Sequence, residues 1–432
     1  MRQLLADKVS DTHVGLWLLV PEHLRLGTWD ILAGWTRQAP ETVHPRLALQ
    51  LVHEAALCAT GLRESRNLTH RGFALLNGLP FLASDQAVHD LLHAHTVEQA
   101  QQVQILLGRL RRASGHFPGR ALAIDPHHLE SHTQRHVRQH RHAPADASVK
   151  TLQTFFCLDI DTCQPVAMTI GSSSKTAAQG AFDLLALVMA IFPSPSHPIF
   201  LLADKEHFSI ELFRFVKERT PFILITPIPD RRAFQRDMRR LPPEAFTARW
   251  AGLATAKLPF HFAKAPDIPL TQIVQRCGEK PSEYQFHGFL STQDCDELQL
   301  LVEDYPDRWH IEEFFNAHQA LGWKRAGTYN LHIRYGQMTC ALLAQTVIHQ
   351  FRQRLGTPVA SWDAPHLARS LFTGLEGDVR VVGDTLLVTY YNAPLSDSLR
   401  HHYEHLPSRL AQENVDPRIP WLYNFKLDFR FR

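Results

Sequence analysis

The chain has 432 residues, enough for about two to four domains with separate hydrophobic cores. Its composition, 44% hydrophobic and 20% charged, is that of a globular protein and excludes a disordered or fibrous chain. The formal net charge of only +2 excludes a globally basic nucleic-acid-binding protein, so any DNA-binding surface would have to be local.

Six scattered cysteines contain no C-x-x-C pair, so we expect reduced thiols and neither a disulfide framework nor a zinc finger. The longest apolar run, residues 184–192, is shorter than a membrane span requires. The N-terminus mixes charged residues among apolar ones, unlike a secretory signal. Together these features predict a cytoplasmic protein.

Residues 1–113 are predicted to form a helical domain. Apolar residues recur at helical spacing in LALQLVHEAALCATGL (47–62) and again in VEQAQQVQILLGRLRR (97–112). The second segment ends in a basic group, Arg109, Arg111 and Arg112, just before a Ser-Gly pair that marks the change of pattern.

From residue 114 to residue 227 the pattern is that of strands alternating with helices. The predicted elements are a strand RALAID (120–125), a hairpin of two strands (151–161 and 165–172), a helix (177–192), a strand PIFLLAD (198–204), a helix (209–219) and a strand (221–229). This order predicts an α/β fold with a mixed sheet covered by helices.

Residues 228–285 break that rhythm and are predicted to form an insertion with little periodicity. The insertion carries five arginines, Arg231, Arg232, Arg236, Arg239 and Arg240. They indicate a clamp on DNA phosphates, and the alternative is a solvated helix face balanced by neighbouring aspartates. Residues 286–335 return to the core with a strand (286–292) and a further helix.

The C-terminal region, 336–432, is predicted to begin with a helix over residues 340–355, ended by Gly356. A hairpin follows, with strands on either side of Gly383-Asp384, a pair that suits a tight turn.

The segment YPDRWHIEEFFNAHQ (305–319) contains the most informative pattern for function. In a helix, Tyr305, Arg308, Glu312 and Gln319 fall on one stripe, because their offsets from Tyr305 are close to whole turns. A carboxylate and an arginine on one face suit a metal-and-phosphate site. The alternative interpretation is an amphipathic helix with a solvated polar stripe.

Two further acids, Asp125 and Asp204, follow apolar strands in RALAID and PIFLLAD. Acids at strand ends can converge outside an open sheet, so we expect both to lie near Glu312. Three carboxylates in one pocket are costly unless cations fill it, and oxygen ligands favour Mg²⁺ or Mn²⁺ over zinc. Two such ions can support the displacement of a phosphodiester.

With these residues the chain resembles the IS4-type DDE transposases. Its Y-x2-R-x3-E spacing matches the signature of that family, whose last position, Gln319 here, is normally lysine. The ALAID and LLAD-KEHF segments stand where the family places its first two catalytic aspartates. The resemblance covers about residues 115–330 and implies a ribonuclease-H-like core with an insertion before the Glu-bearing helix.

The resemblance implies that Asp125, Asp204 and Glu312 bind two Mg²⁺ or Mn²⁺ ions and that Tyr305 and Arg308 hold DNA phosphates. It implies hydrolysis at terminal inverted repeats that frees a 3′-OH, which then attacks the opposite strand or target DNA. It also implies an N-terminal domain that binds transposon ends, a homodimer on double-stranded DNA, and a bacterial, nucleoid-associated location.

Several interpretations stay open. Gln319 keeps a hydrogen-bond donor but lacks the lysine charge, which leaves a catalytically silent DNA-binding relative, or a metal-dependent nuclease without strand transfer, as alternatives. Trp250 and Trp309 are candidates for steadying a flipped base. In the histidine-rich stretch 127–142, His128, His132 and His136 would form a helical stripe, but a solvated or DNA-facing loop is favoured over a zinc site.

Overall fold

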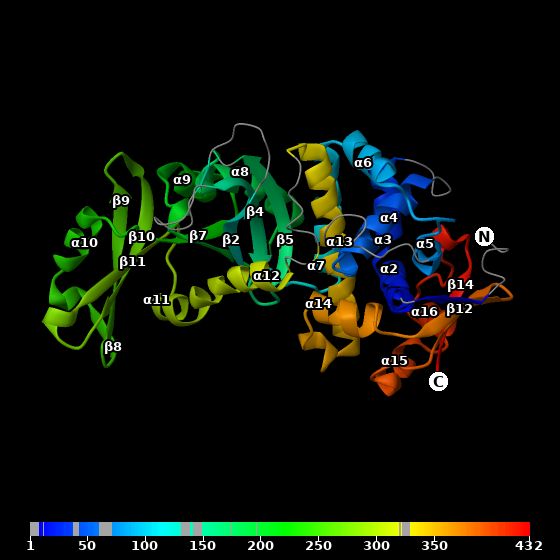
Figure 1. Ribbon diagram of the computed structural model, residues 1–432. Helices are drawn as coiled ribbons and strands as arrows, with labels where there is room; N and C mark the ends of the chain where they lie inside the picture. Colours follow the sequence, from blue (N-terminus) through cyan, green and yellow to red (C-terminus); the bar gives the residue numbers. More distant parts are fainter. Residues whose placement is uncertain are drawn as a thin grey trace. The chain divides into compact units, whose positions relative to one another are not determined.

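A computed structural model describes residues 8–11, 13–37, 43–59, 71–130, 139–140, 149–172, 174–195, 197–318, 321 and 329–432. The chain divides into two compact units (Figure 1). One comprises residues 112–315, and the other combines residues 1–111 with residues 316–432. The predicted N-terminal helical domain and the C-terminal region therefore belong to one unit, although they are far apart in sequence.

The unit 112–315 is built around one large mixed sheet with the strand order β3-β4-β2-β6-β7-β11-β10-β9-β8, and β5 pairs with β4. Its strands are β2 (Ala121–Glu130), β3 (Gln139–His140), β4 (Val149–Asp159), β5 (Gln164–Ser172), β6 (Ile199–Ala203), β7 (Phe222–Pro227), β8 (Thr247–Trp250), β9 (Leu253–Phe262), β10 (Ala265–Cys277) and β11 (Gln285–Ser291). Strands β2, β6 and β7 are mutually parallel, whereas β4 runs antiparallel to both β2 and β5. The predicted order of strands and helices over 120–229 and the mixed α/β sheet are confirmed.

Two helices, α8 (Ala177–Ile191) and α9 (Ile210–Arg219), pack side by side through Phe182 and Phe215, whose ring centroids are 5.0 Å apart. Helix α8 begins where Thr176 and Gln179 cap each other's backbone in a capping box. It approaches β4 closely at Gly180, because a Cβ there would lie only 2.3 Å from the Phe155 ring. These helices cover one face of the sheet.

The prediction that residues 228–285 have little regular structure is wrong. A helix, α10 (Arg232–Arg239), is followed by the antiparallel strands β8, β9 and β10, and β11 joins this meander edge to edge with β7. The insertion thus extends the same sheet. Small alternating residues such as Ala254 and Ala256, together with prolines inside β9 and β10, hide the strand periodicity from sequence inspection.

The second unit contains helices and a four-stranded sheet of order β1-β12-β13-β14. Its principal elements are β1 (Val9–Asp11), α2 (Val20–Leu26), α3 (Thr28–Thr36), α4 (Val43–Ala56), α5 (Arg71–Leu76), α6 (Asp85–Ala94), α7 (Val97–Ala113), α13 (Leu331–Leu355), α14 (Ala364–Leu367), β12 (Gly377–Val382), β13 (Thr385–Tyr390), α15 (Ser396–Tyr403), α16 (Leu406–Gln412) and β14 (Lys426–Phe431). The predicted hairpin is confirmed, with Gly383 at φ 64° in its turn. The predicted helix over 340–355 is confirmed and begins earlier, at Leu331.

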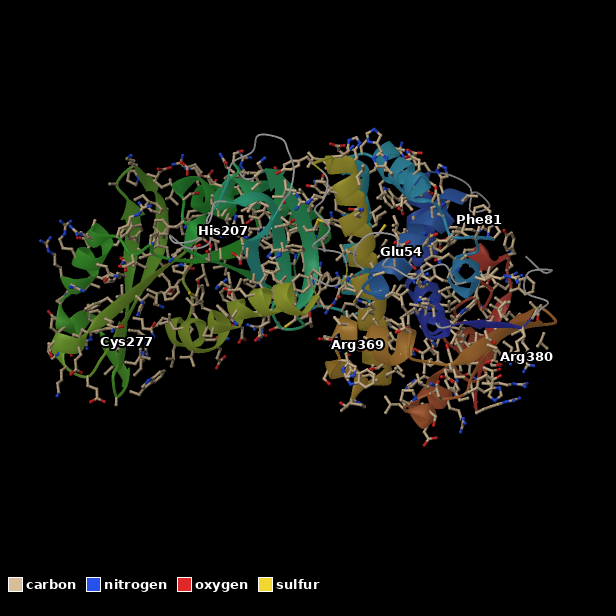
Figure 2. All side chains as sticks on the ribbon, viewed as in Figure 1. Glu54, Phe81, His207, Cys277, Arg369 and Arg380 are labelled. Carbon is tan, nitrogen blue, oxygen red and sulfur yellow. The ribbon has the colours of Figure 1, made fainter. Side chains whose placement is uncertain are left out.

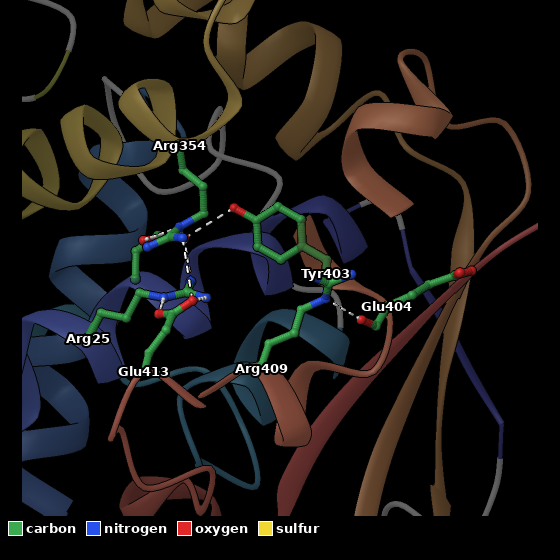
Figure 3. Close-up of polar contacts among 7 residues, drawn as sticks. Arg25, Arg354, Tyr403, Glu404, Arg409 and Glu413 are labelled. Carbon is green, nitrogen blue, oxygen red and sulfur yellow. Dashed lines mark hydrogen bonds and ion pairs between the residues drawn. The ribbon is translucent and has the colours of Figure 1, made fainter. Parts of the chain in front are cut away.

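A buried carboxylate, Glu22, ties α2 to distant parts of this unit. It accepts hydrogen bonds from Arg25 at 2.8 Å, from Arg354 on α13 at 3.1 Å, and from the hydroxyl of Tyr403 on α15 at 3.2 Å. The same two arginines also pair with Glu413 (Figure 3). Segments from both ends of the chain are therefore joined through one network of opposite charges.

Among the described residues, no helix is both long enough and apolar enough to cross a membrane.

Candidate active site

Asp125 and Asp204 are brought together by the parallel pairing of β2 with β6. Ile124 lies in register with Ala203 at the last pair of this ladder, and the two aspartates are the next residues along each strand's chain segment. Residues in register on adjacent parallel strands lie side by side. Strand β2 continues to Glu130, so Asp125 marks the end of its pairing with β6 rather than the end of the strand.

Asp204 is oriented by the turn that follows β6. Its Oδ1 accepts hydrogen bonds from the backbone N–H of Glu206 at 2.9 Å and from Nδ1 of the buried His207 at 2.8 Å (His207 is labelled in Figure 2). Burial disfavours the charged form of Asp204. The hydrogen bond from His207, together with the charges of His207 and Arg308, nevertheless holds the pKa of Asp204 below its ordinary value. Asp204 is therefore ionised at neutral pH.

The third predicted acid, Glu312, lies on a helical segment that is not a single regular helix. It runs through α11 (Glu297–Gln299), a π-helix η6 (Leu300–Asp304), a 3₁₀-helix η7 (Pro306–Trp309) and α12 (His310–His318). The predicted continuous helix from Tyr305 is corrected accordingly, since α12 begins only at His310. Two members of the predicted stripe nevertheless lie together, because Arg308 donates a hydrogen bond to Glu312, four residues later, at 3.0 Å.

Tyr305 anchors this segment above the aspartates. Its hydroxyl donates to the carbonyl oxygen of Ala203, the residue before Asp204, at 3.2 Å. Its ring packs against Phe289 of β11 with centroids 4.8 Å apart. The segment that leads into α12 and Glu312 is therefore held at the end of β6 by one hydrogen bond and one aromatic contact.

Helix α12 lies over β2 and β4 next to Asp125. Phe156, the register partner of Asp125 on β4, packs against both Phe314 and Phe315. His127, two residues beyond Asp125 and so on the same face, stacks on Phe315 with centroids 4.4 Å apart. These contacts place aromatic rings beside Asp125, which is half-buried.

Asp125 lies near other acidic side chains, and burial together with their charges raises its pKa. Burial, followed by the charges of Asp204 and then Glu312, raises its pKa to about 8, and Arg308 only partly opposes the shift. A carboxyl in this position favours a proton at neutral pH unless a cation replaces it. The need for a counter-charge at this point is the principal electrostatic property of the site.

The donor set fits a divalent cation, since the converging groups are carboxylate oxygens and the negative charge is undercompensated. In the described part of the chain, however, no three His, Cys, Asp or Glu side chains are arranged to hold a metal ion as they stand. Glu312 forms an ion pair with Arg308, so its carboxylate is engaged by that guanidinium.

The five insertion arginines lie on the other face of the sheet. Gly288 of β11 faces α10, because a Cβ on it would lie 2.8 Å from the Met238 sulfur. The next residue, Phe289, packs on Tyr305. Successive side chains of a strand point to opposite faces, so α10 and the Tyr305 segment cover opposite faces (Figure 1). The structure does not bring these arginines to the carboxylates.

Some predicted residues lie elsewhere or outside the described residues. Trp250 is 53% exposed on β8 and Trp309 is 56% exposed on η7, so neither is part of the core. His128 contacts the Gln153 side chain at 2.8 Å. Gln319, His132 and His136 lie outside the residues that the structure describes.

Sequence reasoning missed His207. The signal was present in D-x-x-H directly after a buried strand, because a short turn can return a side chain three residues on to the aspartate. Sequence reasoning also missed the stack of His127 on Phe315.

Comparison with known proteins gives one family. Residues 116–347 match the profile of the family described as Transposase DDE domain. A cryo-EM structure of a piggyBac transposase synaptic complex with hairpin DNA is similar at 13% sequence identity, with a TM-score of 0.45, over 85% of this chain and 82% of that chain. No curated protein matches the chain.

Proposed function

The chain belongs to the DDE transposase family, since the match spans more than half of its length, and from this premise we propose that it cuts and joins DNA at the ends of a mobile element. The observation that supports this most is the convergence of Asp125 with Asp204 where the parallel pairing of β2 with β6 ends. The raised pKa of Asp125 beside an ionised partner suits a site that takes up cations together with a phosphodiester.

In this proposal Asp125, Asp204 and Glu312 hold two divalent cations, Mg²⁺ or Mn²⁺. When bound, such ions stabilise the charge that develops on the attacking and leaving oxygens of a phosphodiester. His207 keeps Asp204 oriented and ionised, so that one carboxylate is ready without losing a proton. Asp125 releases its proton as the cation arrives.

In this proposal Arg308 also binds a DNA phosphate. In the metal-free protein it pairs with Glu312, so the guanidinium and the partly exposed carboxylate compensate each other's charge. If Glu312 served as a ligand of the cation, the Arg308 guanidinium would be available for a DNA phosphate, which it could bind through two parallel hydrogen bonds. Tyr305 fixes the backbone from which Arg308 extends, so the arginine reaches the phosphate from a defined position.

We also propose the subgroup of the family, the type of core fold, the substrates, the oligomeric state and the location. The spacing of Tyr305, Arg308 and Glu312 supports an IS4-type subgroup, and the order β5-β4-β2-β6-β7 supports a ribonuclease-H-like core. We infer terminal inverted repeats and target DNA as substrates, a homodimer as the acting species, and a bacterial cytoplasm with its nucleoid as the location. Each follows from the family resemblance.

The test is cleavage and strand joining by the purified full chain on a supercoiled plasmid that carries the DNA flanking its gene. Mg²⁺ or Mn²⁺ is added, and Glu312→Ala is compared with Glu313→Ala, which removes an exposed neighbouring acid. We expect metal-dependent nicking at the element boundary that is lost in Glu312→Ala and retained in Glu313→Ala.

The other outcomes separate the alternatives. Nicking that survives Glu312→Ala would refute the assignment of the third carboxylate. Cleavage without joining would indicate a nuclease. DNA binding without cleavage would indicate the silent relative, and Gln319→Lys would then test whether the missing charge is the cause.

A further inference from the structure

A π-helical turn precedes Tyr305 and sets the register of the residues that follow it. In η6 the backbone N–H of Tyr305 donates to the carbonyl oxygen of Leu300, five residues earlier, at 2.9 Å. An α-helix closes after four residues, so η6 holds one residue more per turn. One residue more or fewer at this point would rotate every following side chain by about 100° about the helix axis. The wide turn therefore determines which way Arg308 and Glu312 face.

An ion pair holds the last residue of this turn. Asp304 is buried, at 2% exposure, and its Oδ1 accepts a hydrogen bond from Nη1 of Arg120 at 2.6 Å. The same guanidinium binds both carboxylate oxygens of Asp161, at 2.9 and 3.3 Å, in the turn between β4 and β5. A planar guanidinium that bridges two carboxylates on separate segments fixes the distance between those segments.

The segment is also anchored on the other side of Glu312. Phe315 stacks on His127 of β2, two residues beyond Asp125. Arg120 immediately precedes the same strand, so Glu312 lies between two anchors at β2. Five residues of extended chain, about 17 Å, separate Arg120 from Asp125. The guanidinium therefore acts through the segment and not on the reacting atoms.

We propose that Arg120 is a positioning residue for Glu312, because it fixes the register of η6 through Asp304 and so holds the glutamate beside the two aspartates. Loss of this link would let η6 narrow to an α-helical turn, which would rotate Glu312 away from them. The inference rests on the proposed function, and it adds a distant residue on which the third carboxylate depends. The alternative is that the ion pair merely closes one end of the sheet.

Matched variants of the two acids separate these roles. Asp304→Asn and Asp161→Asn each remove one charge from the same arginine, but only Asp304 lies on the segment that carries Glu312. Arg120→Lys keeps a cation and loses the fork that spans both acids, and it decides the outcome should Asp304→Asn fail to fold.

Two measurements do not depend on cleavage. Hydrogen exchange of the metal-free full chain is followed by mass spectrometry, and Mn²⁺ affinity is measured by electron paramagnetic resonance with and without Glu312→Ala. Cleavage kinetics of the flanking DNA are then compared among the same proteins.

In Asp304→Asn we expect the backbone amides of residues 305–315 to exchange at least about ten-fold faster, with exchange in the strands unchanged. Mn²⁺ should bind about ten-fold more weakly, as for other residues that orient a metal ligand. Adding Glu312→Ala to this variant should weaken Mn²⁺ by less than about two-fold more, because the glutamate has already left the site. The kcat for cleavage should fall while KM for DNA stays within about two-fold. Arg120→Lys should give smaller changes of the same kind, and Asp161→Asn should match the wild type.

Unchanged exchange of residues 305–315 in Asp304→Asn would overturn the proposal, and so would an equal effect of Asp161→Asn. A full effect of Glu312→Ala on Mn²⁺ affinity that persists in Asp304→Asn would show that the ion pair merely closes the sheet. Failure of the proposed function is a different result. A wild type that neither binds Mn²⁺ nor cleaves DNA, but whose residues 305–315 exchange faster only when the link to Asp304 is broken, would keep Arg120 as the positioning residue and lose the catalytic assignment.

Discussion

Glu22 and Asp125 are carboxylates whose pKa burial raises, one fully buried and one half-buried, one in each unit, and their surroundings are opposite. Glu22 has two arginines and a tyrosine hydroxyl within hydrogen-bonding distance; Figure 3 labels these three partners, Arg25, Arg354 and Tyr403. Asp125 has three other acids close enough to raise its pKa and one arginine that opposes them. Burial is the largest cause of the raised pKa in both cases.

The difference separates a structural charge from a functional one. A buried ion that is fully paired holds distant segments together, and removing it leaves its partners uncompensated. A buried ion that is surrounded by like charge weakens the fold and persists where an external cation or substrate supplies the missing charge. The charge around a buried acid is thus more informative about its role than its burial.

The largest effect should come from Asp125→Asn. We expect metal-dependent cleavage to fall by about 10⁴-fold, as for residues that act as a catalytic unit. The metal-free protein should at the same time become more stable, with Tm rising by about 2–4 °C, since the fold no longer has to keep a proton on a carboxyl that is ionised in the unfolded chain. Activity assays and thermal unfolding of the same preparations check both parts. A loss of stability together with activity would mean that Asp125 is a structural acid like Glu22.

The reverse behaviour is expected of Glu22→Gln. Removing this charge leaves Arg25 and Arg354 without their buried partner, so the free energy of unfolding should fall by about 3–5 kcal/mol. Denaturant unfolding of the wild type and the variant at one pH measures the change. A change below about 1 kcal/mol would show that Glu413 alone can satisfy both arginines.

The pH dependence of stability should reveal Asp125 directly. Its pKa is about 8 in the folded state and ordinarily 3.8, so the folded protein binds more protons between these values. Stability of the metal-free protein should therefore fall as the pH rises from about 4 to about 8. The lowered pKa of Asp204 acts only below its ordinary value of 3.8, outside this window.

Subtracting the profile of Asp125→Asn isolates this contribution from that of Glu22. Cation binding should also release up to about one proton at pH 7 in the wild type and none from this position in the variant. Calorimetry in buffers of different ionisation enthalpy measures the release. Equal release by both proteins would contradict the raised pKa of Asp125.

The smallest effect is expected of Glu413→Gln, which changes the exposed partner of the same two arginines. Glu413 is 38% exposed, and exposed pairs contribute only about 0–1 kcal/mol. Denaturant unfolding alongside Glu22→Gln makes the comparison within one network. An effect as large as that of Glu22→Gln would show that the network acts as a whole and that burial of the acid is unimportant.

Local patterns predicted much of the unit 112–315. Apolar runs bounded by turn residues predicted β6 and α8, and the spacing of Arg308 and Glu312 predicted their common stripe. Such features depend on residues close in sequence, where helix and strand periods act directly. Strands β8, β9 and β10 were missed because small residues and prolines hide the strand periodicity along them, whereas β11, which pairs with β7, was predicted.

The sequence by itself determined where the candidate residues stand: two aspartates after apolar runs, and a glutamate one helical turn after an arginine. Only the tertiary structure decided what each of them faces. The parallel register of β2 with β6 sets Asp125 beside Asp204, the fold of the turn brings His207 to Asp204, and the sheet puts the α10 arginines on the opposite face. The physical reason is that side-chain type and spacing are local properties, whereas burial, charge compensation and the choice of face arise from long-range pairing.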